Sequence, residues 1–137
     1  MHFEYQVFEA DFVNAGSASS AVKKTLKQLN IDPKIIKRVV VALYEAEVNA
    51  IAHAYGGTIT ADIEPDRIRM VVADTGPGIP DIDWAMQEGH STASPEVRDM
   101  GFGAGMGLPN IKNNVDKLNV SSTVGVGTTV EMEVMFV

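Results

Sequence analysis

The stretch 32-DPKIIKRVVVALYEAEVNAIAHAY-55 contains the strongest structural signal in the chain. Apolar residues recur along it at intervals of three and four, the spacing of one face of an α-helix. They are Ile35, Ile36, Val39, Val40, Leu43, Ala46, Ala50 and Ile51. Asp32 is a favourable N-cap, Pro33 is a favourable first helical residue, and Gly56-Gly57 would end the helix. The pattern predicts a helix of about 22 residues.

Weaker signals on either side give the order of elements. Apolar and polar residues alternate over 3–8, which indicates a strand, and Ser17 to Leu29 has helical spacing. Further strands are expected over Thr58 to Ile63, Arg67 to Asp74, Asn119 to Val124 and Thr128 to Phe136, and further helices over Ile82 to Glu88 and Leu108 to Leu118. This order predicts an α+β fold: a single domain over residues 1–137 with two layers, in which helices cover one face of a mixed, mostly antiparallel sheet.

Composition argues against several classes of function. The net charge of −7 opposes a nucleic acid or an anionic membrane as the main partner. The chain has no cysteine, which excludes disulfides, thiolate chemistry and cysteine-based zinc sites. There is no signal peptide pattern, and the longest apolar run, Val39 to Leu43, is far shorter than the ~20 residues of a membrane span. We therefore expect a soluble, cytoplasmic protein.

Glu45 and Asn49 are four residues apart on the long helix and so share one face, and His53 lies one turn further on. A solvated polar stripe would explain all three. However, the helix is otherwise strongly apolar, and polar groups on a partly buried face need partners. The Asn49 amide oxygen is a hard, neutral ligand suited to Mg²⁺, and the Glu45 carboxylate could act as a general base. We interpret His53 as a packed or capping residue rather than a ligand.

The segment 74-DTGPGIPD-81 follows a strand that is apolar enough to be central. Gly-Pro-Gly is turn chemistry, so a tight turn alone would explain it. The alternative is a pocket, because Gly76 and Gly78 lack Cβ atoms and let a flat ring lie against the backbone. Asp74 could then accept a hydrogen bond from an exocyclic amine such as that of adenine. Near the end of the chain, 125-GVGTT-129 needs no function beyond that of a hairpin turn.

A glycine-rich stretch, 101-GFGAGMGLPNIKNN-114, has glycine at alternate positions directly before an expected helix. It matches neither the P-loop nor the Rossmann fingerprint. A flexible linker would explain it. Free backbone N–H groups beside the positive end of a helix also form an anion site, for which phosphate is the usual ligand, and we favour this interpretation.

In this order the pieces resemble the ATP-binding domain shared by gyrase B, heat-shock protein 90, histidine kinases and the MutL mismatch-repair proteins, the GHKL superfamily. The shared pattern is Glu-x-x-x-Asn on a helix, Asp-x-Gly-x-Gly after a strand, a long segment ending in Gly-x-Gly, and a last Gly-x-Gly-Thr. It covers essentially the whole chain and implies the Bergerat ATP-binding fold. Within the superfamily the chain looks most like the anti-sigma-factor serine kinases and RsbT-type switch kinases, through 76-GPGIPDI-82, 89-GHST-92, 105-GMGLP-109 and 49-NAIAHAY-55.

The resemblance implies ATP and Mg²⁺ as cofactors and a role for each matched residue. Glu45 would be the catalytic base and Asn49 the Mg²⁺ ligand. Asp74 would bind adenine in a pocket shaped by Gly76 and Gly78.

The remaining implied roles concern the end of the glycine-rich stretch and the last strand. A lid containing Gly103, Gly105 and Gly107 would wrap the phosphates, and Thr128 would support the adenine-binding aspartate through its hydroxyl, either directly or with a water. Related kinases carry an arginine beside the lid glycines, whereas residues 100–107 here contain no Lys or Arg. Arg98 is therefore the candidate for stabilising the γ-phosphate.

The leading hypothesis from this resemblance is an ATP-dependent protein serine/threonine kinase of a partner-switching pathway, which phosphorylates a small STAS-like anti-sigma antagonist. The alternative is a non-catalytic ATP-sensing module whose lid, ordered by nucleotide, presents a surface to a partner such as a sigma factor. A stand-alone histidine-kinase catalytic domain is disfavoured because the chain has no room for a phosphoacceptor helical hairpin. Related kinases pair as dimers, so the resemblance also implies a homodimer, which no sequence feature shows.

Overall fold

The computed structural model describes residues 1–79, 81–86 and 107–137. Its elements follow in the order β1 (His2–Phe8), the short 3-10 helix η1 (Phe12–Asn14), α1 (Ser17–Gln28), α2 (Pro33–His53), β2 (Gly56–Ile63), β3 (Arg67–Asp74), α3 (Ile82–Ala85), α5 (Gly107–Asn114), β4 (Lys117–Thr123) and β5 (Gly127–Met135). The α+β class predicted from the sequence is confirmed. No helix in the described ranges is long and apolar enough to cross a membrane.

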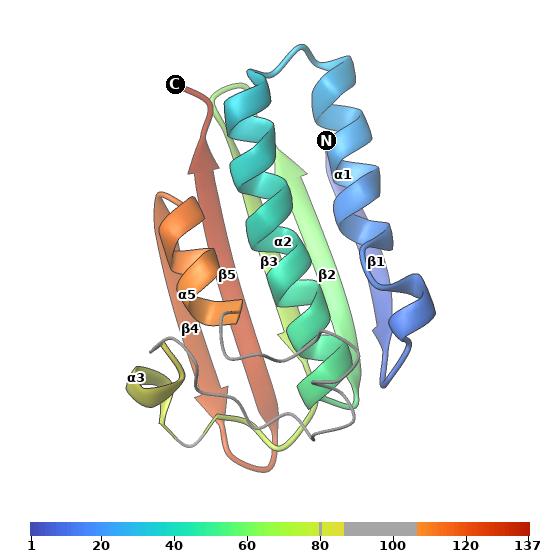
Figure 1. Cartoon of the computed structure of the whole chain (residues 1–137), viewed down its shortest axis with the longest axis vertical. Helices are drawn as coiled ribbons and strands as arrows, with labels where there is room; N and C mark the ends of the chain where they lie inside the picture. The colour runs from blue at the N-terminus through green and yellow to red at the C-terminus, as the bar shows by residue number, and fades with distance from the viewer. Residues whose placement is uncertain (80, 87–106) are drawn as a thin grey trace.

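The strands form one five-stranded sheet in the order β1-β2-β3-β5-β4 (Figure 1). Every described pairing is antiparallel, so the expectation of some parallel pairing is wrong. The reason is that α1 and α2 run in opposite directions between β1 and β2, which returns the chain to the sheet antiparallel to β1 (Figure 1). The other sequential strand pairs, β2–β3 and β4–β5, are also antiparallel.

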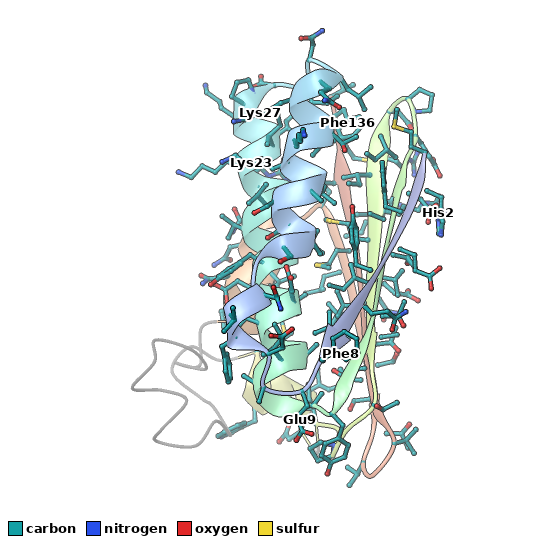
Figure 2. The ribbon with its side chains drawn as sticks, turned by 90° about the vertical axis from the view of Figure 1, so that its right-hand side faces the viewer. His2, Phe8, Glu9, Lys23, Lys27 and Phe136 are labelled. Carbon is teal, nitrogen blue, oxygen red and sulfur yellow. The ribbon has the colours of Figure 1, made fainter. Side chains whose placement is uncertain are left out.

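The helices cover one face of the sheet and leave the other face bare (Figures 1 and 2). Lys23 and Lys27 point outward from the helical layer, whereas His2 lies on the sheet side (Figure 2). Between the layers is a single cluster of apolar side chains from strands and helices. Its largest fully buried members are Leu26, Leu43, Ile59, Ile68, Met70, Ile111, Val22, Val39 and Val134. Burial of each such side chain contributes roughly 1.5–3 kcal/mol.

Helix α2 lies in the middle of the helical layer, with α1 on one side and α5 on the other (Figure 1). Its apolar stripe, which includes Leu43 and Ala46, faces the core. Glu47 is almost fully buried, and its carboxylate oxygens accept the backbone N–H groups of Ala18 and Ser19, each at 3.3 Å. A carboxylate at these free N–H groups complements the positive N-terminal end of α1. The buried charge thus fixes α1 against α2.

The bare face of the sheet carries a row of charged residues that crosses all five strands. In the strand register, residues from β1, β2, β3, β5 and β4 stand opposite one another in the order His2, Asp62, Arg69, Glu133 and Lys117. Acidic and basic side chains alternate along this row. Opposite charges directly across neighbouring strands stabilise a sheet modestly, by roughly 0.2–1 kcal/mol per pair.

Several element boundaries differ from the prediction. The helix expected over residues 108–118 ends at Asn114, and β4 begins at Lys117 rather than Asn119. The Asn114 side chain donates to the Asn110 carbonyl oxygen at 2.7 Å, and the Asp116 carboxylate accepts the Met135 backbone N–H, also at 2.7 Å. These two bonds end the helix and turn the chain into the sheet. The short helix expected over 82–88 ends at residue 85, and positions 87 and 88 lie outside the described residues.

Replacement of the N-cap of α2 should destabilise the protein. The Asp32 carboxylate accepts the Lys34 backbone N–H at 2.8 Å. We expect Asp32→Ala to lower the free energy of unfolding by about 1 kcal/mol, because one of the free N–H groups of the first turn loses its partner. Asp32→Ser keeps an acceptor and should recover most of that loss, as measured by urea unfolding. Equal losses for the two variants would show that the cap is not the cause.

Candidate functional site

Three segments meet at the end of the sheet where β3 finishes (Figure 1). The turn after β3 is hydrogen-bonded on one side to the junction of α2 and β2, through Tyr55 N–H to Thr75 O at 2.7 Å and Thr75 N–H to Gly56 O at 3.0 Å. On the other side it is bonded to the β4–β5 turn, through Gly76 N–H to Val126 O at 3.1 Å. Backbone bonds thus hold the turn between two other segments.

Asp74, the last residue of β3, is half-buried at this junction. Its Oδ1 atom accepts the backbone N–H of Thr128 at 3.0 Å. The Thr128 hydroxyl lies 2.8 Å from the Ser122 hydroxyl, and its support of Asp74, directly or through a water, stays a prediction. The register explains this contact, because Ser122 stands directly opposite Thr128 in the β4–β5 pair. Only one carboxylate oxygen of Asp74 is therefore bonded to this strand, and the carboxylate keeps further acceptor capacity.

Burial raises the pKa of the Asp74 carboxyl above its usual range, and the Thr128 hydrogen bond offsets only part of this effect. The ionised form of this carboxylate therefore lowers the free energy of unfolding. Perturbed carboxyl groups occur often at functional sites, so the raised pKa is consistent with a binding role for Asp74.

Neither Gly76 nor Gly78 has room for a Cβ atom, because other protein atoms lie too close. A Cβ on Gly76 would lie 3.0 Å from the Ala54 Cα, at the end of α2. Gly78 has φ +77°, and a Cβ there would lie 2.6 Å from the Thr123 carbonyl oxygen. Both glycines are therefore required for the close approach of the three segments. Contact of these glycines with a flat ring remains a prediction.

Ser122 was not identified from the sequence, although it connects three parts of the site. Its hydroxyl accepts the Ile79 backbone N–H at 2.7 Å, donates its own O–H to the Gly127 carbonyl oxygen at 3.1 Å, and lies beside the Thr128 hydroxyl. It thereby ties the turn after β3 to both strands of the last hairpin. A serine in a polar strand carries no sequence signal for such a role, since the partner at position 79 is a backbone group.

The second cluster of predicted residues lies where α2 faces α5. Glu45 and Asn49 are half-buried on the side of α2 opposite to Glu47. The Asn110 side-chain N–H donates to Glu45 Oε1 at 3.2 Å. A Cβ on Gly107 would lie 2.8 Å from both the nitrogen and the oxygen of the Asn49 amide. The structure thus brings Gly107 close to Asn49 and Asn110 close to Glu45, and the roles assigned to these predicted residues stay predictions.

The ligands available to a metal are few. The described residues contain no group of three or more His, Cys, Asp and Glu side chains that could hold a metal ion. A Mg²⁺ at Asn49 would take one amide oxygen from the protein and its other ligands from water and phosphate, a common arrangement for this ion. The single half-buried amide therefore fits Mg²⁺ bound together with a nucleotide.

Three predicted site residues, Arg98, Gly103 and Gly105, lie outside the described residues, as does the side chain of His53. Their assigned roles stay predictions. Of the predicted phosphate lid, only Gly107 falls within the described part of the chain.

The comparisons with known proteins agree with this geometry. A family model described as the histidine kinase-like ATPase domain matches residues 8–134. An anti-sigma F factor of Caldanaerobacter subterraneus subsp. tengcongensis is 36% identical over 124 residues, which cover 87% of this chain and 83% of that protein. The serine/threonine-protein kinase RsbT of Bacillus subtilis is 32% identical over 127 residues, which cover 90% and 87%.

Among solved structures, the RsbU and RsbW domains of a Mycobacterium tuberculosis protein superpose with a TM-score of 0.66 at 18% identity. The match covers 98% of this chain and 32% of that one. At this identity the similarity shows the fold.

Removal of the Asp74 charge should stabilise the protein at neutral pH. The folded-state pKa of Asp74 is raised, so the ionised carboxylate opposes folding above that pKa, and the effect disappears as pH falls through it. Asp74→Asn keeps the shape and the acceptor for the Thr128 N–H. We expect this variant to be at least as stable as the wild type at pH 7, and the difference to shrink towards about pH 4.

Asp116 provides a control, because the pKa of its carboxyl is shifted in the opposite direction to that of Asp74. The Met135 backbone N–H lowers the pKa of its carboxyl. Asp116→Asn should therefore be less stable than the wild type at neutral pH, and this deficit should shrink on acidification. Urea unfolding across the pH range measures both differences. A loss of stability in Asp74→Asn at neutral pH would contradict the assigned effect of burial.

Proposed function

The chain belongs to the histidine kinase-like ATPase domain family, and on that premise we propose that it is an ATP-dependent protein serine/threonine kinase of the anti-sigma, partner-switching type. The observation that carries this proposal is the pairing of Glu45 with Asn49 on the half-buried side of α2 that faces α5. A carboxylate one turn from an amide provides a candidate base beside a candidate Mg²⁺ ligand.

Each predicted site residue has a distinct task in this proposal. Asp74 accepts a hydrogen bond from the exocyclic amine of adenine, in the junction built by the turn after β3. Asn49 contributes its amide oxygen to Mg²⁺, which when bound with ATP neutralises charge on the phosphates. Glu45 accepts the proton of a serine or threonine hydroxyl of the protein substrate. Gly103, Gly105 and Gly107 contact the phosphates, and Arg98 stabilises charge that develops on the γ-phosphate.

We propose a small STAS-like anti-sigma antagonist as the substrate and the cytoplasm as the location, because the relatives are named as an anti-sigma F factor and as the kinase RsbT. A sigma factor is the second proposed partner. A homodimer is proposed on the same grounds, and sedimentation of the purified protein tests it.

A nucleotide-sensing module without phosphotransfer is the second candidate function. Two observations favour it. Arg98 is the only Lys or Arg in the sequence between residues 75 and 111, so few cations are available for the transferred phosphoryl group. The relative from Caldanaerobacter is named for its action on a sigma factor, not for catalysis. In this case Mg²⁺–ATP would bind and strengthen association with a sigma factor, but no phosphate would be transferred.

Loss of the Glu45 carboxylate should separate ATP binding from phosphotransfer. We expect Glu45→Ala to bind Mg²⁺–ATP with nearly wild-type affinity in calorimetry. Transfer of radiolabelled γ-phosphate to purified STAS-domain proteins of the source organism should fall by about 10²–10⁴, the usual contribution of a general base.

The matched control is Glu131→Ala, which removes an exposed carboxylate from β5. This variant should transfer phosphate at the wild-type rate. Undiminished transfer by Glu45→Ala would show that the base is wrongly assigned. ATP binding by the wild type without transfer to any STAS-domain protein would favour the nucleotide-sensing module.

A further inference from the structure

The side chain of Glu45 is connected to a helix that is distant in sequence. Asn110, on α5, donates one N–H of its side-chain amide to Glu45 Oε1 at 3.2 Å, in a partly buried position 65 residues away along the chain. The bond leaves Oε2 of Glu45 without a partner from Asn110. One carboxylate oxygen is thus held while the other can receive a proton.

Helices α2 and α5 contact each other through two pairs of residues. On α2, Glu45 and Asn49 are one turn apart, and on α5 Gly107 and Asn110 are also one turn apart. Because Gly107 has no Cβ, the first turn of α5 can approach the Asn49 amide closely. The same approach brings Asn110 within reach of Glu45. A larger residue at position 107 would move the helix away and lengthen the Asn110–Glu45 bond.

Asn110 is itself held in place through its helix. Its carbonyl oxygen accepts the Asn114 side-chain N–H at 2.7 Å. Arg38 of α2 donates to the Asn114 carbonyl oxygen at 3.2 Å and forms an ion pair with Asp116 at 3.1 Å. Ile111, the next residue along α5, is fully buried in the core. The donor therefore approaches Glu45 from a helix that is held at its C-terminal end and packed into the core.

The chemistry of an amide suits this position. A side-chain amide donates hydrogen bonds but is neither protonated nor deprotonated near neutral pH, so it can orient a carboxylate without competing for the substrate proton. A lysine in its place would bring a full positive charge to the carboxylate and stabilise its ionised form. An aspartate would place two carboxylates side by side, and their repulsion would turn Glu45 away.

We propose that Asn110 is a positioning residue that holds the Glu45 carboxylate for proton abstraction. Its bond makes the orientation of the base depend on the first turn of α5, the helix that starts directly after the glycine-rich stretch. The assignment rests on the proposed kinase function, in which Glu45 is the base. Asn110 acts through Glu45 and does not contact the substrate.

The variant that tests this role is Asn110→Leu, which keeps the size of the side chain and removes its donor. Asn113→Leu is the matched control, since Asn113 is exposed on the same helix and makes no side-chain hydrogen bond within the described residues. We expect Asn110→Leu to lower kcat for phosphotransfer by about 10- to 100-fold, the range for a misplaced catalytic group, with little change in KM for ATP. The control should match the wild type.

A double-mutant cycle separates positioning from a general structural effect. Glu45→Asp keeps a carboxylate but withdraws it from Asn110. If Asn110 acts through Glu45, Asn110→Leu should cause a much smaller loss in the Glu45→Asp background than in the wild type. An equal loss in both backgrounds would overturn the proposal.

A measurement without nucleotide tests the bond itself. In the NMR spectrum, the side-chain amide resonances of Asn110 should shift on Glu45→Ala and stay unchanged on Glu131→Ala. Wild-type kcat in Asn110→Leu, or unshifted amide resonances in Glu45→Ala, would overturn the positioning role and leave the kinase function standing. Absence of phosphotransfer by the wild type would overturn the proposed function and the positioning role together.

Discussion

The packing of α2 across the middle of the sheet is the constraint on which the rest of the structure depends. One stripe of this helix is apolar and faces the core, and the two stripes beside it face α1 and α5. Glu47 falls on the α1 side, whereas Glu45 and Asn49 fall on the α5 side. Because helical geometry fixes these directions relative to the core residues, the burial that stabilises the fold also orients the candidate base and the candidate metal ligand.

The two halves of the site are built on different physical principles. The surroundings of Asp74 are formed mainly by backbone. Hydrogen bonds join the turn after β3, the segment that follows α2, and the last hairpin. Around Glu45 the contacts are between side chains on two helices. Backbone walls tolerate little change in shape, which suits recognition of a flat base. A contact between helices changes whenever one helix moves, which suits a step that should occur only after the phosphates are bound.

Much of this could be predicted from the sequence, and the exceptions have physical reasons. The period of apolar residues in α2 and the alternation in the strands are strong signals, so the elements and their class were correct. The pairing of Glu45 with Asn49 follows from their spacing alone. The bond from Asn110 could not be predicted, because it depends on how closely α5 approaches α2. The contact between the Thr128 and Ser122 hydroxyls could not be predicted either, because it is determined by strand register.

The row of alternating charges on the bare face has a consequence for how the sheet assembles. If any strand slid by one residue along its neighbour, its member of the row would turn towards the helices and lose its oppositely charged neighbours. The observed alignment of the five strands keeps the whole row outside and matched, and a slip of one residue does not. Asp74 and Thr128 come from different strands and meet only in that alignment. The face that carries none of the candidate site residues therefore helps to decide whether the site on the opposite side forms.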